Sequence, residues 1–376
     1  MAVSSSDSRV ISLLRFPLTF AVVMQHSMGT ITTDIRWTSL SGLDLYSLLK
    51  SLCSGCMALI AVPAFFFISG YLFFGNVTTM DSSVYKAKMT TRLKSLLVPY
   101  LGWNLLTVPI LLLVTYGEAM NGTRTMADFT DLLHNGRWTH IFWDFSSHDA
   151  LYGNLWGMHL LKDSPVLSTF WYVRDLIIMC LLSPLVYWYV TRTRWVGFWA
   201  LVVLFVLRLW PHMTLGPQSL FFVFGAYASL LGGSLTTSGA TLRRAIYGVA
   251  AVLFVVVFSL LGNDTYHGFL LTPAFTLAGC YAVLNLGAFF AKRHPGFAFP
   301  QLLTKSSFFV YALHMQLALP LAFFLLKKLF SGVEHPLLLA LQYLLTPCLI
   351  YAICLAAYVV MQKLTPRLLA VLNGSR

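Results

Sequence analysis

Long runs of apolar residues alternate along the whole chain with short polar connections. An α-helix needs about 20 apolar residues to cross the hydrocarbon core of a bilayer. Runs of that length predict membrane-spanning helices at about 9–28, 54–75, 95–116, 169–191, 195–210, 216–233, 245–262, 268–291, 306–326 and 337–361. The pattern therefore predicts an all-α, polytopic transmembrane helical bundle of about ten helices.

The cations gather in alternate connections, and most of the 13 acidic residues fall in the others. The positive-inside rule makes the cation-rich side cytoplasmic, so both termini are predicted to lie in the cytoplasm. The cation-rich side holds Lys86, Lys88, Arg92, Lys94, Arg192, Arg194, Arg243, Arg244, Lys292 and Arg293, and the C-terminal tail adds Lys363, Arg367 and Arg376.

The composition agrees with a membrane protein. Of the 376 residues, 58% are hydrophobic and only 10% are charged, which is too apolar for a soluble globular protein. The net charge of +12 is explained by basic inner loops that meet anionic membrane lipids. We therefore expect lipid contacts and no nucleic-acid partner. The first span has no small-residue cleavage site and is expected to be retained.

One connection, at about 117–168 on the outer side, is long enough to be an extracytoplasmic insertion. It is rich in aromatic residues and is expected to form a cap over the outer mouth. Its histidines lack the close helical spacing of a zinc pair, so no metal is expected. These histidines are His134, His140, His148 and His159. The Cys53–Cys56 pair has no evident metal or redox partner and is interpreted as structural.

The first span, RFPLTFAVVMQH over residues 15–26, carries an ionisable group at each end. Eleven helical steps of about 100° return a side chain to within about 20° of its starting direction and advance it by about 16 Å. Arg15 and His26 therefore share one helix face, with Arg15 near the inner surface and His26 deep in the membrane. Buried ionisable groups of this kind usually mark a functional path. The alternative is that Arg15 snorkels to headgroups and His26 makes an interhelical hydrogen bond.

Several stretches together resemble the integral-membrane acyltransferase family 3, which includes bacterial O-acetyltransferases of surface polysaccharides. The first span has the family's arginine, ten residues, histidine pattern in Arg15 and His26. The other stretches are VPAFFFISGYLFF, KMTTRLKSLLVPYLGWN, FWYVRDLIIMCLLSPL, SLFFVFGAY and SSFFVYALH. The third of these six segments is similar to members related to enterobacterial common-antigen acetylation.

The resemblance implies one transmembrane acyltransferase domain over 1–376, in the bacterial cytoplasmic (inner) membrane. It implies transfer of an acyl group, expected to be acetyl, from cytoplasmic acyl-CoA to a hydroxyl of a cell-surface glycan or a lipid-linked glycan precursor. The chain ends without the hydrolase-like domain that some relatives append, so transfer is expected within the membrane unit or with a separate partner.

In that reaction His26 is the predicted general base, because its ordinary pKa lies near neutrality. Cations on the inner side are expected to bind the CoA phosphates, and these are Arg15, Lys88, Arg92 and Lys94. The chain departs here from the family's common Arg, two residues, Arg pattern, because Lys94 follows Arg92 after one leucine. Which cation meets CoA is therefore left open.

The tetrahedral oxyanion needs hydrogen-bond donors, and the candidates are Ser69, the Tyr71 hydroxyl and the backbone at Gly70. No nucleophile-elbow motif supports a covalent acyl-enzyme, so direct transfer is preferred. His314 is a second deep histidine that could pair with His26, contact the acceptor or bond to a neighbouring helix. Lys305 lies on the opposite helix face from His314 and is interpreted as an inner-surface cation.

Trp171, Arg174 and Asp175 open the fourth span at the outer interface. They suit either recognition of an acceptor sugar or an interfacial anchor with a local ion pair. The alternative function is that of a transporter or flippase for a glycan or small solute, because such proteins also carry charged residues within the membrane. No internal repeat of the kind common in transporters is apparent. A noncatalytic structural protein would make little use of Arg15, His26 and His314.

Overall fold

The computed structural model describes residues 4–27, 45–122, 124–135, 141–143, 151–155, 158–161, 165–209, 215–232, 234–236, 239–260, 271–332 and 335–374. The longer helices are α1 (Ser5–His26), α3 (Ala61–Phe74), α4 (Ser82–Arg92), α5 (Val98–Met120), α6 (Met126–Asn135), α7 (Trp171–Leu181), α8 (Ser183–Val206), α9 (Leu220–Tyr227), α10 (Ala240–Leu260), α11 (Leu271–Arg293), α14 (Leu319–Leu329) and α15 (Pro336–Leu364). The shorter ones are α2 (Leu45–Lys50), α12 (Gln301–Lys305), α13 (Ser307–Leu313) and α16 (Pro366–Leu372).

Several helices join through short segments of a different helical type. The π-helical turns are η3 (Ser51–Cys56), η5 (Leu93–Leu97), η9 (Ala228–Gly232) and η10 (His314–Ala318), and the 3₁₀ turns are η4 (Met57–Ile60), η7 (Ser168–Phe170) and η8 (Pro217–Ser219). In this way α2 continues into α3, α4 into α5 and α13 into α14. Single π turns inside helices occur often at functional sites.

The prediction of an all-α transmembrane bundle is confirmed. Helix occupies each of the segments predicted to span the membrane. In the described part of the chain, 7 continuous helical stretches are long and apolar enough to cross a membrane. Helix α1 is not one of these stretches. The total number of crossings and the cytoplasmic position of the termini stay predictions.

The predicted span at 169–191 is not one straight helix. Helix α7 ends at Leu181, and α8 begins at Ser183, directly before Pro184. Proline has no backbone N–H to continue the hydrogen-bond ladder, which explains the break. Arg194 then has a φ of 49° inside α8 and separates it into two helical parts. This second break falls in the connection predicted between the fourth and fifth spans.

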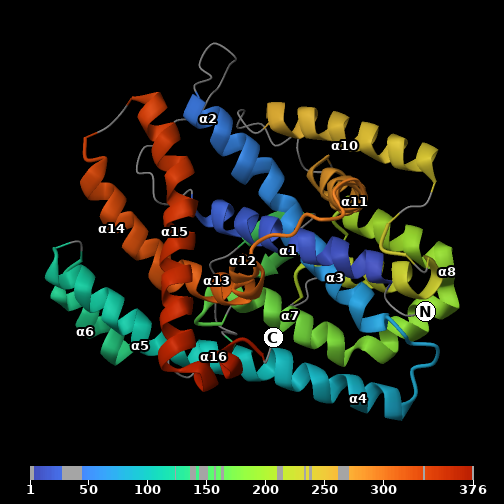
Figure 1. The fold of residues 1–376 in the computed structure, drawn as a ribbon, viewed down its shortest axis with the longest axis horizontal. Helices are drawn as coiled ribbons and strands as arrows, with labels where there is room; N and C mark the ends of the chain where they lie inside the picture. The colour runs from blue at the N-terminus through green and yellow to red at the C-terminus, as the bar shows by residue number, and fades with distance from the viewer. Residues whose placement is uncertain are drawn as a thin grey trace.

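Helix α1 lies at the centre of the bundle and packs against α3, α11, α13 and α15 (Figure 1). Two hydrogen bonds fix its register against the antiparallel α2–α3 segment. The Tyr71 hydroxyl donates to Asp7 Oδ2 at 2.8 Å, and the Ser54 hydroxyl donates to the Met24 carbonyl at 3.0 Å. Each pair of residue numbers has the same sum, so a position on α3 can be matched to its level on α1.

Helices α3 and α9 cross at very close range. A Cβ atom added to Gly70 would lie 2.0 Å from the Phe222 carbonyl oxygen, and one added to Gly225 would lie 2.1 Å from the Phe67 carbonyl oxygen. Small residues let transmembrane helices approach until their backbones touch. Gly70 is therefore needed for this crossing.

The insertion at about 117–168, predicted to lie on the outer side, is described only in part. It contains α6, which packs against α5, and a short antiparallel hairpin of β1 (Leu151–Leu155) and β2 (Met158–Leu161). These are the only strands in the described ranges. Of the four histidines in the insertion, His140 and His148 lie outside the described residues. The predicted cap stays a prediction.

The last helix, α16, packs against α5. The Trp103 indole N–H donates to the Leu372 carbonyl at 2.9 Å, and this contact is buried. The following Gly374 has a φ of +67°, a conformation that favours glycine. An added Cβ there would lie 2.5 Å from the Ser95 carbonyl oxygen. The end of the chain is thereby held against η5.

Candidate functional site

One face of α1 forms a wall of an internal cavity. Ile11, Arg15, Thr19 and Val22 line it, and their spacing of four, four and three residues follows one helix face. His26 is the next position on that face, one turn beyond Val22. The predicted shared face of Arg15 and His26 therefore runs along a cavity. The cavity wall ends at Val22, and His26 lies about 6 Å further along the helix axis.

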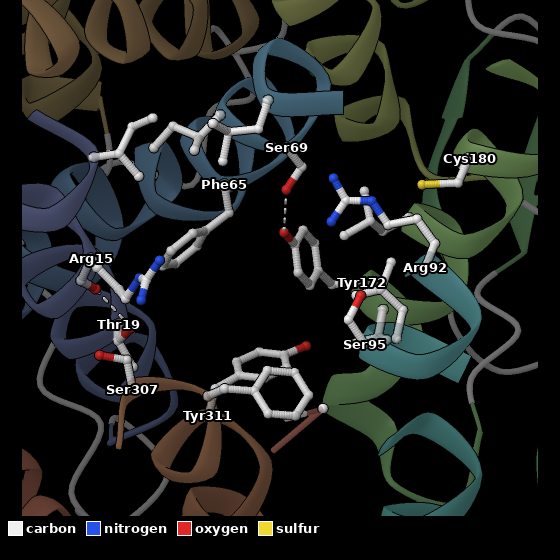
Figure 2. Close-up of a pocket in the computed structure, with 18 of the residues that line it drawn as sticks. Arg15, Thr19, Phe65, Ser69, Arg92, Ser95, Tyr172, Cys180, Ser307 and Tyr311 are labelled. Carbon is white, nitrogen blue, oxygen red and sulfur yellow. Dashed lines mark hydrogen bonds between the residues drawn. The ribbon is translucent and has the colours of Figure 1, made fainter. Parts of the chain in front are cut away.

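The cavity has a volume of about 750 Å³ and lies between α1, α3, α4, η5, α7, α12 and α13. Figure 2 shows the side chains of Arg15 and Arg92 pointing into this space from opposite sides, with Ser69, Tyr172 and Tyr311 around it. The Ser69 and Tyr172 hydroxyls are 3.4 Å apart, a long hydrogen bond. A volume of this size is typical of pockets for small molecules and cofactors.

Cations and hydroxyl groups gather at the end of the cavity formed by α4, η5 and α12. Arg92, Lys94 and Lys305 line it, and the hydroxyls are those of Thr90, Thr91, Ser95 and Thr304. Lys94 and Lys305 are exposed, so this end is open. Cations interspersed with hydroxyl donors suit phosphate oxygens. Lys305 comes from a distant helix and lines the same cavity as Lys94. Its position at the inner surface stays a prediction.

Lys88 occupies a different position. Its ammonium donates to the Phe73 and Gly75 carbonyls at the C-terminal end of α3. The last carbonyls of a helix have no partner within the helix, and a cation stabilises them. Lys88 is not among the residues that line the cavity. Its geometry is that of a helix cap for α3.

The N-terminal end of α4 is capped by Asp81. Its Oδ1 accepts hydrogen bonds from the Ser83 hydroxyl and from the Val84 N–H, and these lower the pKa of the Asp81 carboxyl from its ordinary value. A lowered pKa means that the cap stabilises α4 at pH values above the ordinary carboxyl pKa and is lost as the pH falls through the lowered one. The cap thus holds α4, which carries Arg92, at neutral pH.

Aromatic side chains surround the deep end of the cavity. The Tyr172 and Tyr311 rings meet edge to face with centroids 5.9 Å apart, and the Tyr311 ring stacks on Phe170 at 5.7 Å. The Tyr311 hydroxyl donates to the Thr169 carbonyl. Tyr311 is therefore held from both its ring and its hydroxyl, between the cavity and the histidines.

The two deep histidines are neighbours. The ring centroids of His26 and His314 lie 5.2 Å apart with an interplanar angle of 46°. His314 is fully buried, whereas His26 is half-buried. The structure thus brings together one residue from the first predicted span and one from the ninth. Of the alternatives for His314, pairing with His26 is the one that this arrangement supports.

Ser69 and Tyr71 lie far from this histidine pair. The register of α3 on α1 places Tyr71 opposite Asp7 and Ser69 opposite Arg9. Arg9 is about 25 Å from His26 along the axis of α1. The hydroxyls of Ser69 and Tyr71 are therefore too far from His26 to stabilise an oxyanion that forms beside it. Ser69 belongs to the cavity wall, and Tyr71 binds Asp7.

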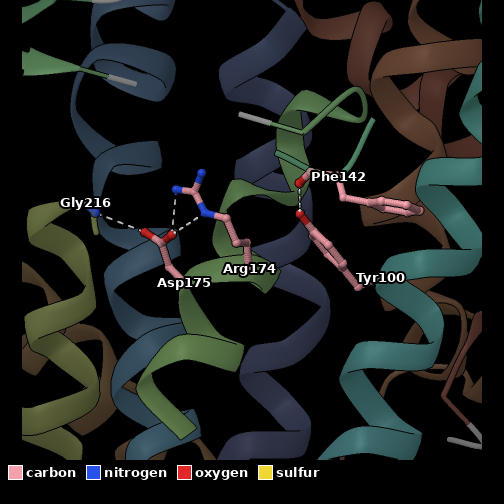
Figure 3. A network of polar contacts seen from close by, with 5 residues as sticks. All are labelled: Tyr100, Phe142, Arg174, Asp175 and Gly216. Carbon is pink, nitrogen blue, oxygen red and sulfur yellow. Dashed lines mark hydrogen bonds and ion pairs between the residues drawn. The ribbon is translucent and has the colours of Figure 1, made fainter. Parts of the chain in front are cut away.

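Arg174 and Asp175 form a buried ion pair with each other. Arg174 Nε and Nη2 donate to Asp175 Oδ1 at 2.9 and 2.7 Å, and Asp175 Oδ2 accepts from the Gly216 N–H at 3.0 Å (Figure 3). The Arg174 guanidinium also lies 4.9 Å from the centre of the Trp143 ring. The pair ties α7 to the segment before η8. Trp171 packs nearby, with its ring centroid 6.4 Å from that of Phe66.

Thr19, Tyr311 and Ser95 are among the cavity residues that were not singled out from the sequence. Thr19 lies four residues from Arg15 on the same helix face, so the helical period alone would have found it. Tyr311 precedes His314 by three residues and shares its side of the helix. Ser95, by contrast, lines the cavity at a π-helical turn, which no sequence pattern indicated.

The comparisons with known proteins agree with a membrane-bound enzyme. Residues 9–361, most of the chain, match a protein family described as an acyltransferase domain. No curated protein matches the chain, and no solved structure matches it. The family match covers the cavity-lining face of α1, the cavity cations Arg92, Lys94 and Lys305, and both deep histidines. It does not include Gly374.

Proposed function

The chain belongs to the membrane acyltransferase family 3, and from this premise we propose that it transfers an acetyl group from cytoplasmic acetyl-CoA to a hydroxyl of a cell-surface glycan or its lipid-linked precursor. The observation that carries the proposal is the continuous face of α1, which runs from Arg15 in the cavity to His26 beside it. The proposed setting is the bacterial inner membrane, with the cation-rich end of the cavity facing the cytoplasm.

The donor would enter with its nucleotide at the cation-rich end. Arg92, Lys94 and Lys305 are placed to bind phosphate oxygens there, and Arg15 reaches the same space from α1. Arginine is suited to phosphates because its planar guanidinium forms paired hydrogen bonds. Lys88 is a weaker candidate in this proposal, because its ammonium is bound to the end of α3.

The acyl end would extend along α1. The wall from Ile11 to Val22 rises about 16 Å, which is on the order of the length of a pantetheine arm. The thioester would then lie at the deep end, between Val22 and Tyr311. From there His26 is one helical turn away. The proposal thus assigns donor binding to one end of the helix face and chemistry to the other.

His26 would act as general base. An alcohol attacks poorly until its proton is removed as the new bond forms. In the proposed step the acceptor oxygen bonds to the thioester carbonyl carbon, and its proton moves to His26. The carbon–sulfur bond then breaks, and the CoA thiolate takes that proton. The products are the acetylated acceptor and free CoA, with no covalent enzyme intermediate.

The experiment that tests the donor site is calorimetric binding of CoA and acetyl-CoA to the purified protein in detergent. We expect micromolar affinity, and a loss of about tenfold or more in Arg15→Ala, because a charge-assisted hydrogen bond is removed. Arg9→Ala is the matched control. Arg9 lies on the same helix but donates to the His294 and Phe297 carbonyls, outside the cavity.

Unchanged affinity in Arg15→Ala would move the phosphate site to Arg92, Lys94 and Lys305. An equal loss in Arg9→Ala would mean that damage to α1, and not the lost cation, explains the effect. Absence of binding in the wild-type protein would reject the acyl-CoA donor and leave a transporter as the better interpretation.

A further inference from the structure

His314 has a defined protonation pattern. Its Nδ1 lies 2.7 Å from the Tyr311 carbonyl oxygen. A carbonyl oxygen only accepts hydrogen bonds, so the neutral imidazole must carry its proton on Nδ1. The other nitrogen, Nε2, is then left with a lone pair. Bonding at one ring nitrogen fixes the role of the other, as in histidines that serve as bases or ligands.

That lone pair has no partner in the described part of the chain. Nε2 is buried and makes no hydrogen bond, and the side chain as a whole is 0% exposed. A buried acceptor without a donor is unfavourable, and native structures rarely keep one without a functional reason. His314 thus presents an acceptor in a dry environment where one donor would be strongly favoured.

The side chain of His26 is placed to supply that donor. The ring centroids are 5.2 Å apart, and each ring has a radius of roughly 1.1 Å. A rotation of the His26 ring that points one of its nitrogens at Nε2 would therefore form a hydrogen bond of about 3 Å, which the structure itself does not contain. His26 ends α1, and His314 directly follows α13, which packs against α1. His314 also begins the π-helical turn η10, where a helix is locally widened.

We propose that His314 is a positioning residue for His26: its Nε2 accepts the N–H of the His26 imidazole, which turns the remaining lone pair of His26 towards the acceptor hydroxyl. This inference rests on the proposed acyl transfer, in which His26 removes the hydroxyl proton. When His26 takes that proton, the bond to His314 becomes charge-assisted and stabilises the imidazolium. His314 itself neither gains nor loses a proton.

Tyr311 couples this arrangement to the donor cavity. Its ring lines the cavity, its hydroxyl is held by the Thr169 carbonyl, and its own carbonyl holds His314. One residue therefore contacts the space assigned to the donor and fixes the orientation of the second histidine. The base and the acyl group are thus positioned by the same turn of α13.

The test compares three substitutions of His314. Glutamine places its amide oxygen near the position of Nε2, asparagine places its amide near the position of Nδ1, and leucine removes both polar atoms. The assay is incorporation of label from radioactive acetyl-CoA into membrane material, in membranes of cells that produce the full-length variant. CoA binding by the purified variants checks that each one folds and keeps its donor site.

We expect His314→Leu and His314→Asn to lower kcat by roughly 10- to 100-fold, the effect typical of losing a residue that orients a functional histidine. The KM for acetyl-CoA should stay within about twofold, because the donor cavity is untouched. His314→Gln should recover most of the wild-type kcat, because it restores an acceptor to His26.

Wild-type turnover in His314→Leu would overturn the inference, as would equal losses in the glutamine and leucine variants that both still bind CoA. A raised KM in all three would assign His314 to the structure of the donor site instead. Failure of the proposed function gives a different result, since the wild-type protein would then neither bind CoA nor incorporate label.

Discussion

At the scale of single residues, the important distinction is between ionisable groups that face the cavity and those bound to the backbone. Arg15 and Lys88 are both cations that the sequence places near the cytoplasmic side as a prediction. Arg15 reaches into the cavity, whereas Lys88 is bound by the last carbonyls of α3. His26 lies beyond the cavity on the face of Arg15 and next to His314. Position on a face, and not residue type alone, decides which groups can meet a substrate.

His26→Ala is the substitution that tests the base. We expect acetyl incorporation to fall by roughly 10²- to 10⁴-fold, the range attributed to a general base, because the acceptor hydroxyl keeps its proton. CoA affinity should stay within about twofold, since His26 is not part of the cavity wall. Radiolabel incorporation and calorimetry measure the two effects separately.

His294→Ala is the control for a lost histidine. His294 packs on Phe290, with ring centroids 4.7 Å apart, and lies outside the cavity. This variant should keep wild-type turnover. Substantial turnover in His26→Ala with a normal acetyl-CoA requirement would reject His26 as the base.

At the scale of helices, two contacts decide how the cavity forms. Asp7 and Met24 hold α1 in register against the α2–α3 segment, and the glycines of α3 and α9 let those helices touch. The first contact aligns the cavity-lining face of α1 with the α3 wall of the cavity. The second contact holds α3 in place against α9.

Gly70→Ala should therefore destabilise the protein by about 1–3 kcal/mol, as is typical when a group is forced into a packed interface. The new methyl group would meet the Phe222 backbone, which cannot move aside as a flexible side chain does. Thermal unfolding in detergent measures the effect as a lower Tm, with reduced expression as a second sign.

Gly248→Ala is the matched control, because Gly248 lies in α10 with no atom within 4 Å of the added group. It should leave the Tm unchanged or raise it slightly, since alanine favours helix over glycine. Equal melting temperatures of the two alanine variants would contradict the close packing of α3 and α9.

At the scale of the whole molecule, the mouth of the cavity is built from three distant parts of the chain. Residues 90–96 supply one wall, Thr304 and Lys305 another, and Gly374 a third. Trp103 holds the last of these through the Leu372 carbonyl. Gly374 lies beyond residue 361, where the family match ends. The turn at Gly374 is therefore a feature of this chain that the family match does not include.

Gly374→Val should weaken CoA binding several-fold, because the added side chain would project between the Ser95 backbone and the mouth. Gly332→Val is the control for backbone strain. Gly332 has a φ of +74°, but nothing lies within 4 Å of an added Cβ. Calorimetric titration with CoA compares the two variants. Equal affinities in both would show that the turn at Gly374 has no part in donor binding.

The sequence by itself determined the helices and the face of α1 that carries Arg15 and His26. Both depend on local properties: the length of an apolar run, and a period of about 3.6 residues that repeats along one helix. The same period extends to Thr19 and Val22. It also placed the cations of the inner loops on one side of the membrane as a prediction. None of these inferences requires knowledge of which helix lies beside which.

Only the tertiary structure decided the partners of these residues. Ser69 and Tyr71 were plausible donors for an oxyanion until the register of α3 on α1 placed them opposite Arg9 and Asp7, far from His26. His314 contacts His26 although the two positions are 288 residues apart, and no local period relates positions so distant in the chain. The physical reason is that contacts between helices depend on how distant segments pack, and a repeating local pattern contains no information about that packing.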